Sequence, residues 1–272
     1  MGVAIKKLSS PELVQQMEAS MLAYHMLMGR GSRAEEYRTP QVHLMVSGAP
    51  DSIFNGVLRA AIPPEQADET IEKIIGRFRA YKVTGSWHVG PSSRPLDLGE
   101  RLLARGFRHI GDRSGMAMAI PPASRRLLIP DGVTIRLASS LRDIDRWMSV
   151  FRQVSGLSLY QHAWYLGRYR KLEYPRYSVL QVLAELDEEA VGTAAVFLFG
   201  EVAVLSDITV LPAARRKGIG SALTRFTLRE ARMHQFQIGA LRAPESAVPF
   251  FQQVGFQEYC TFNLYEWPLK KR

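Results

Sequence analysis

A short glycine-containing segment near residue 218 has the composition of a phosphate-binding loop. It reads Arg215-Arg216-Lys217-Gly218-Ile219-Gly220-Ser221 and is followed at once by a helical pattern. The first N–H groups of a helix lack intrahelical acceptors and carry partial positive charge, so they stabilise an anion. Gly218 and Gly220 let the backbone approach that anion, and the basic side chains add charge. We expect a pyrophosphate at this glycine loop. The alternative is that the segment is only a strand-to-helix turn that needs glycine for its geometry, with solvated basic side chains.

The elements that position the glycine loop follow from the apolar pattern around it. Residues 202–210 form an apolar run that reads as a strand, with Val202, Val204, Ile208 and Val210 on one face. Beyond the loop the period lengthens, and the apolar residues recur at helical spacing as Ile219, Ala222, Leu223, Phe226 and Met233. The sequence therefore predicts strand, loop and helix in that order.

Further elements are predicted on both sides of this unit. The second half should contain strands at 133–137, 177–187, 190–199, 238–241 and 261–267, with helices at 141–154, 157–169 and 247–254. The strands 177–187 and 190–199 read as a hairpin turned by Asp187-Glu188-Glu189. In the first half we expect helices at 13–28 and 64–81 and strands at 42–47, 53–61 and 83–89.

A proline-rich passage at 120–126 separates two related segments. We predict two domains, residues 1–122 and 123–272. A weak internal repeat agrees: residues 100–107 (ERLLARGF) and 248–256 (VPFFQQVGF) each read as a short helix ending in Gly-Phe, followed by a strand. The first half has no glycine-rich turn between a strand and a helix.

Composition narrows the classes of protein. The chain has 272 residues, 46% of them hydrophobic, and a net charge of +9. It shows no membrane-length apolar run and no signal peptide at its N-terminus, so we expect a soluble, cytoplasmic protein without membrane contact. The single cysteine, Cys260, excludes an internal disulfide, and no histidine pair has a metal-ligand spacing. The positive charge favours an anionic partner, but the basic groups are short and scattered, so nucleic acid is not favoured.

The second half resembles the GNAT-type N-acetyltransferase superfamily. An apolar strand ending in V-x-P, then R-x-x-G-x-G and a following A-L, resembles its motif A, and residues 247–256 resemble its later signature ending in Gly-Phe. The resemblance is direct over residues 133–267 and looser in the first half. It implies an α/β (α+β) fold of two GNAT-like domains in tandem. Each would have a mixed, mostly antiparallel sheet flanked by helices, and the C-terminal one would hold CoA at a splayed strand pair.

The resemblance also implies which residues bind the cofactor, acetyl-CoA. The end of the splayed strand would pair with the pantetheine amides, the glycine loop would bind the pyrophosphate, and the loop after the next strand would meet the cofactor arm. In chain order these residues are Ile208, Thr209, Val210, Arg215, Arg216, Lys217, Gly218, Ile219, Gly220, Ser221, Pro244, Ser246, Phe250 and Phe251.

By the same resemblance the chain would transfer an acetyl group to a primary amine by direct attack in a ternary complex. Where some relatives carry a glutamate, this chain has Val204, which leaves Asp207 as the first candidate base and Glu245 as the second. Many relatives have a tyrosine that is proposed to protonate the leaving thiolate, and this chain has Phe251 at that position. The proton would therefore have to come from Ser246 or from water. Alternatively, Asp207 has a structural role, as a polar residue at the end of a strand whose side chain bonds to a neighbouring loop.

Other interpretations stay open. A non-catalytic acyl-CoA-binding or regulatory protein is compatible with Phe251 and with the degenerate first half. The aromatic group on the helix 157–169 either bounds the acceptor pocket or belongs to the core, and it consists of Tyr160, His162, Trp164, Tyr165 and Tyr169. Trp147 and Trp267 are expected in the core, and Cys260 as a small buried residue rather than an acyl carrier. The acceptor and the oligomeric state, a homodimer included, are not fixed by the sequence.

Overall fold

The computed structural model describes residues 10–29, 34–124, 126–172 and 179–269. Within them the chain forms two compact units that are not contiguous in sequence. Unit 1 contains residues 10–20, 116–241 and 249–257, and unit 2 contains residues 21–115, 242–248 and 258–269. Each unit therefore takes segments from both sides of residue 122, and the division into residues 1–122 and 123–272 stays a prediction.

Unit 1 is built on a sheet whose strands run in the order β10-β9-β8-β7-β6. Their bounds are β6 (Val133–Leu137), β7 (Val179–Leu186), β8 (Glu189–Phe199), β9 (Val202–Val210) and β10 (Ile238–Pro244). Neighbours from β6 to β9 are antiparallel, whereas β9 and β10 are parallel. Asp187 and Glu188 both have positive φ, as a two-residue type I′ hairpin requires. Glu189 is the first residue of β8, so the sequence-based prediction that it belongs to the turn is wrong.

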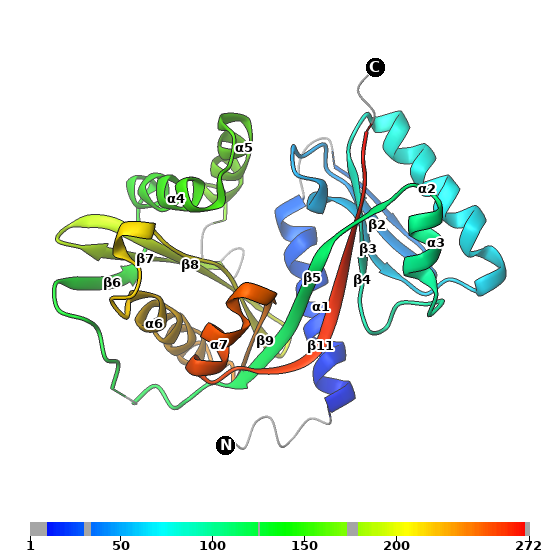
Figure 1. Ribbon diagram of the computed structural model, residues 1–272. Coiled ribbons are helices and arrows are strands. Elements are labelled where there is room, and N and C mark those ends of the chain that lie inside the picture. The colour runs from blue at the N-terminus through cyan, green and yellow to red at the C-terminus, as the bar shows by residue number, and fades with distance from the viewer. Residues whose placement is uncertain (1–9, 30–33, 125, 173–178, 270–272) are drawn as a thin grey trace. The chain divides into compact units, whose positions relative to one another are not determined.

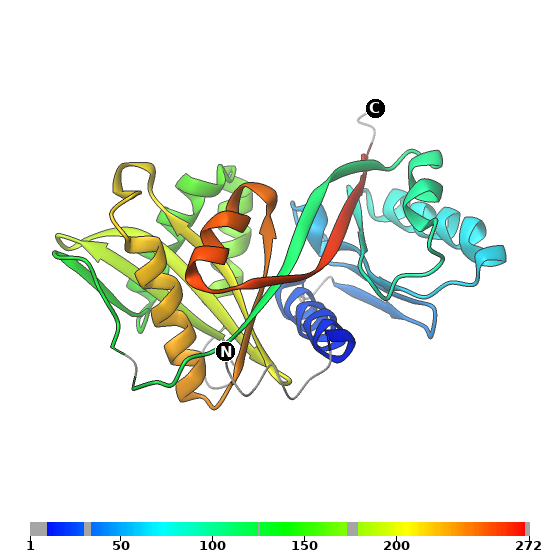
Figure 2. The same cartoon turned by 60° about the horizontal axis from the view of Figure 1, so that its bottom comes forward.

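Helices cover both faces of the unit 1 sheet. In Figure 1, α4 (Leu141–Ser155) and α5 (Leu159–Tyr169) lie on one face and α6 (Ile219–Met233) on the other. Figure 2 shows α6 along the strands from a second side. The apolar stripe of α6 packs against β7 and β8, but Met233, predicted on that stripe, is 63% exposed in the last turn. The short helix α7 (Val248–Val254) and the 3-10 turns η4 (Pro212–Ala214) and η5 (Glu245–Ala247) complete this part of the chain.

An ion-pair cluster fixes α4 to the edge of the sheet. Arg136 on β6 donates to Asp143 at 2.7 Å and to Glu185 on β7 at 3.0 Å, and Arg146 also pairs with Glu185. The hydrogen bond from Arg136 holds the pKa of Asp143 well below its usual range. Ser140 caps the same helix by accepting from the Asp143 N–H at 3.1 Å. Position and orientation of α4 are therefore set by charged and capping contacts as well as by apolar packing.

Unit 2 has its own sheet and core. Its strands run in the order β1-β2-β3-β4-β11-β5, with bounds β1 (Glu35–Arg38), β2 (Val42–Val46), β3 (Asn55–Ala60), β4 (Gly85–Val89), β11 (Gln257–Trp267) and β5 (Arg108–Ala119). The helices α2 (Ala67–Tyr81) and α3 (Leu98–Ala104) pack on this sheet around buried Phe78 and Trp87 (Figure 1). The 3-10 turns η2 (Ser52–Phe54) and η3 (Pro64–Gln66) precede β3 and α2, and α1 (Ser10–Gly29) belongs to both units.

The predicted repeat is present. After α3, Gly106 has φ +84° and Phe107 is buried before β5, and after α7, Gly255 has φ +123° and Phe256 is buried before β11. Both helices thus end at a left-handed glycine. The strand β1 and the first eight residues of β5 were not predicted. In the described part of the chain, no helix is both long and apolar enough to cross a membrane.

Candidate active site

A β-bulge interrupts β9 at Asp207. Thr193 on β8 pairs with Thr209, and Ala195 pairs with Ser206, so the single residue Ala194 faces both Asp207 and Ile208. Asp207 has φ +53°, in the left-handed region. Aspartate tolerates that region better than most residues, because its short polar side chain can bond locally. The bulge turns β9 and gives Asp207 an orientation that a regular strand would not give.

Polar contacts from β8 and α4 hold the bulge in place. The Thr193 hydroxyl donates to the main-chain oxygen of Asp207 at 2.8 Å and lies 2.7 Å from the Thr209 hydroxyl. On the neighbouring residue of β8, the carbonyl of Ala194 accepts from the Trp147 indole N–H at 3.0 Å. Trp147 is fully buried, as the sequence predicted. The backbone groups around the bulge are therefore satisfied by side chains rather than by a regular ladder.

The Asp207 carboxyl group has two hydrogen-bond donors. The Tyr169 hydroxyl donates to Oδ2, and the Ser206 hydroxyl donates to Oδ1 at 3.0 Å. Burial raises the pKa of Asp207 to about 6, while the two hydrogen bonds act in the opposite direction. No described lysine or arginine pairs with it. Near neutral pH this carboxylate is mostly ionised yet close to its pKa, which suits a general base.

Tyr169 reaches Asp207 because α5 ends there. The tyrosine is 1% exposed, and its ring lies 4.6 Å from that of Trp147. The next residue, Arg170, pairs with Asp145 of α4 at 2.6 Å and ties the end of α5 to α4. Within the aromatic group predicted on this helix, Tyr165 is also buried, whereas Tyr160 is 68% exposed. The sequence placed Tyr169 on the right helix but gave no sign of its contact with Asp207.

The strands β9 and β10 pair over a short length only. Their register joins Val202–Val204 to Ile238–Ala240 and continues no further. Ile208, Thr209 and Val210 follow on β9, each half-buried. Main-chain groups of this part of β9 that face away from β8 have no partner in the described register. This agrees with the predicted splay and leaves a strand edge that an extended ligand could join.

The glycine loop starts directly beyond β9. Arg215 Nε donates to the Val210 carbonyl at 3.0 Å, so this side chain fastens the loop to the strand. Arg216 and Gly218 have φ of +65° and +77°, and Gly218 is the N-cap of α6. The first described bond of α6 runs from the Ala222 N–H to the Gly218 carbonyl. No described residue accepts a hydrogen bond from the main-chain N–H groups of residues 216–221.

Small residues leave room at this loop. A Cβ atom at Gly220 would lie 3.4 Å from the Phe250 ring and 3.8 Å from a Val210 methyl group. Phe250 contacts Phe251, which is buried and packs edge-on against Phe256 with 5.8 Å between the ring centroids. A methyl group at Gly220 would make ordinary van der Waals contacts with these side chains, so the glycine leaves a methyl-sized space beside the loop backbone. Free N–H groups, exposed basic residues and this space fit a pyrophosphate.

The remaining predicted residues lie in the segment 242–248 of unit 2. Pro244 ends β10, Glu245 and Ser246 are in η5, and all three are exposed. They are thus grouped with the other unit, apart from Asp207 and the glycine loop. Cys260 lies on β11 and is partly buried. Among the described residues, no group of three or more histidine, cysteine, aspartate or glutamate side chains could hold a metal ion.

A comparison with protein families identifies the segment that carries this site. Residues 178–258 match the model of the acetyltransferase (GNAT) domain. This segment is therefore similar to a GNAT domain. The match includes β7 to β10, the bulge at Asp207, the glycine loop and α7. Such a domain supports an acetyltransferase function in general, with an acyl donor and an acceptor as its partners.

Solved structures resemble the fold over most of the chain. A GCN5-related N-acetyltransferase from Kribbella flavida has a TM-score of 0.71 at 17% identity, covering 92% of this chain and 95% of its own. A functionally unknown conserved protein from Staphylococcus epidermidis has a TM-score of 0.67 at 14% identity, covering 86% and 94%. A tandem GNAT protein from the clavulanic acid biosynthesis pathway has a TM-score of 0.64 at 14% identity, and the match covers 97% of this chain and 98% of that protein. No curated protein shows a significant match. These likenesses confirm the predicted α/β fold class.

Proposed function

We propose that this chain is an acetyl-CoA-dependent N-acetyltransferase that acetylates a primary amine by direct attack in a ternary complex. The proposal is supported by two features that follow each other along the chain, from β9 through the glycine loop to α6. A partly buried carboxylate with a pKa of about 6 lies in the bulge of β9. An anion-binding loop with unpaired N–H groups follows the same strand.

Residues of the chain would hold the cofactor at three places. The N–H groups of residues 216–221 and the basic side chains would bind the pyrophosphate, and the β9 edge at 208–210 would pair with the pantetheine amides. Residues 244–251 would contact the rest of the arm, with Pro244, Ser246, Phe250 and Phe251 as the predicted contacts. When bound, acetyl-CoA supplies an activated acetyl thioester.

The chain itself has to orient the amine and take its proton. Asp207 would accept the proton as the nitrogen forms its bond to the acyl carbon, and Glu245 is the second candidate. The main-chain N–H of Ile208 or Val210 would donate to the oxygen that gains negative charge. Phe251 cannot protonate the leaving sulfur. A thiol of pKa about 8.5 can leave as the thiolate without that proton. Ser246 or water is the proton donor that the sequence suggests in its place.

The test is release of free CoA from acetyl-CoA across a panel of primary amines. The wild-type protein should release CoA with at least one amine, and Asp207→Asn should lower the rate by about 10²- to 10⁴-fold, the usual contribution of a general base. Asp187→Asn, in the hairpin turn of the same unit, is the matched control and should leave the rate unchanged. Equal rates for Asp207→Asn and wild type would remove Asp207 from the mechanism.

A second candidate is a non-catalytic acyl-CoA-binding protein. It is favoured by the buried phenylalanine at 251, which has no proton to donate. Calorimetric binding of acetyl-CoA without CoA release for any amine would select this candidate. Absence of binding would refute both.

A further inference from the structure

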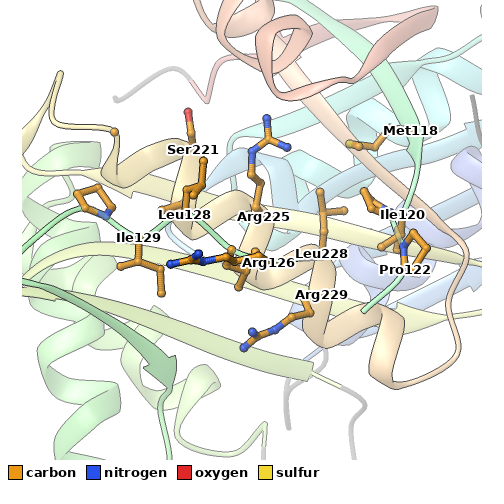
Figure 3. A pocket seen from close by; sticks show the side chains of 15 residues that line it. Met118, Ile120, Pro122, Arg126, Leu128, Ile129, Ser221, Arg225, Leu228 and Arg229 are labelled. Carbon is orange, nitrogen blue, oxygen red and sulfur yellow. The ribbon is translucent and has the colours of Figure 1, made fainter. Parts of the chain in front are cut away.

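A cavity of about 490 Å³ lies on the outer side of α6 in unit 1. One wall comes from residues 118–122 and 126–130, from the end of β5 towards β6, and the other from residues of α6 and its N-cap, from Gly218 to Arg229. Figure 3 shows Leu128 next to Ser221 and Arg225, with Ile129 toward one end of the pocket and Ile120 and Pro122 toward the other. We call this cavity the linker pocket. It borders the core between α6 and the strands β7 and β8, since Ala222 and Leu127 contribute to both.

Apolar side chains form most of the linker pocket. Met118, Ile120, Leu127, Ile129 and Leu228 line it together with three prolines. At its rim Leu128 is 78% exposed and Ile129 40% exposed. Apolar surface of this kind, gathered around a cavity, is typical of a binding site for a molecule with an apolar body.

The polar part of the lining is cationic. Arg126, Arg225 and Arg229 line the pocket, and no aspartate or glutamate does so among the described residues. Arg229 stacks on Phe226 at 4.9 Å and makes one long ion pair, 3.5 Å to Glu230. Its Nε is buried without a hydrogen-bond partner among the described residues. The Arg229 side chain as a whole is 35% exposed, so its terminal nitrogens, rather than the buried Nε, are able to donate to an anionic ligand in the pocket.

From this combination we propose that the linker pocket binds an organic anion with an apolar body. The cavity volume lies in the range of about 300–1,000 Å³ usual for small-molecule sites. The anionic group faces the arginines and the apolar body lies against Leu128, Ile129 and Leu228. Gly218 and Ser221 line the same pocket. The anion therefore has two sources, a separate organic acid or the nucleotide end of a CoA molecule held at the glycine loop.

The first experiment uses the fluorescent sulfonate 8-anilinonaphthalene-1-sulfonate, which combines apolar rings with one negative group. Its affinity for the full chain should fall about 5- to 10-fold in Arg225→Gln and in Arg229→Gln, as expected for loss of one charge-assisted hydrogen bond. Leu128→Ser should weaken binding as well. Arg232→Gln, on α6 but outside the lining, is the matched control. Equal affinity for all variants, with unfolding midpoints unchanged, would overturn the proposal.

Competition then identifies the source. Displacement of the dye by decanoate, with acetyl-CoA binding retained, indicates a separate acid. Displacement by CoA and by adenosine 3′,5′-bisphosphate, but not by pantetheine, indicates the nucleotide end of the cofactor. If none of these displaces the dye, the pocket has no ligand of the proposed class and the inference is wrong. Because dye binding needs no turnover, this result is independent of whether the chain is an acetyltransferase.

Discussion

Replacing Tyr169 by phenylalanine tests how the structure sets the protonation of Asp207. The tyrosine hydroxyl donates to the carboxylate, and this hydrogen bond lowers a pKa that burial has raised to about 6. A hydrogen bond to a charged group contributes about 1.5–3 kcal/mol, and one pKa unit corresponds to about 1.4 kcal/mol. Without the donor, the pKa of Asp207 should therefore rise by about one to two more units.

The assay is the pH dependence of kcat/KM with one amine for wild type and variant. After division by the neutral fraction of the amine, the wild-type kcat/KM should increase through pH 6 and level off, while the rise of Tyr169→Phe should lie about 1–2 pH units higher. At pH 7 the ionised fraction, and with it the rate, should be about 2- to 10-fold lower in the variant, with recovery near pH 9. The ionisation of the amine is common to both proteins.

Tyr160→Phe, on the exposed side of the same helix, is the control and should leave the profile in place. An unchanged acid limb in Tyr169→Phe would show that the hydrogen bond does not set the pKa of Asp207. An equal fall at every pH would show that Tyr169 only supports the local packing.

Four further variants test other parts of the site and fold. In Asp207→Asn, the folded-state pKa of about 6 lies above the unfolded value, so ionisation costs stability as pH rises from about 4. At pH 7 the variant should be more stable than wild type by about 3 kcal/mol, the equivalent of about two pKa units, and it should melt at a higher temperature, whereas at pH 4 the two proteins should be equally stable. Gly220→Ala should raise the KM for acetyl-CoA about tenfold or more by filling the loop, with little change in urea unfolding. Arg136→Ala should lower the free energy of unfolding in urea by about 2 kcal/mol at pH 7. The difference should shrink as pH falls below about 4, because Asp143 and Glu185 are protonated first in the unfolded chain and only at lower pH in the folded protein. Trp147→Phe should lose about 1–3 kcal/mol by calorimetry, because the buried Ala194 carbonyl loses its donor.

Periodic patterns made most of the fold predictable. The strand 202–210 and the helix from Ile219 appear at those residues, because an apolar run and a helical stripe are local properties of the sequence. The residues Glu35–Arg38 and the start of β5 were missed, since their side chains are mostly exposed and charged and show no alternating apolar face. Propensity gives no signal for such strands, and only pairing with neighbours defines them.

The site was predictable in part for a similar reason. The glycine loop is a contiguous motif, so its residues could be named from the sequence. Asp207 was named because it is the carboxylate left on a strand where some relatives carry a glutamate at the position of Val204. The bulge that orients it was not predicted. Its partner Tyr169 lies 38 residues away in sequence, and nothing in the spacing joins the two. The linker pocket likewise depends on where a proline-rich segment folds back along a helix.

The pairing of β11 with β4 has a consequence for how the protein is made. Asn263–Trp267 lie in register with Gly85–Val89, in the interior of the unit 2 sheet. A ribosome therefore releases β1 to β4 long before their neighbouring strand exists, and the unit cannot close its sheet until residue 267 has left the exit tunnel. During that interval one edge of β4 stays open. An open strand edge of this kind can pair with other strands until β11 has been synthesised.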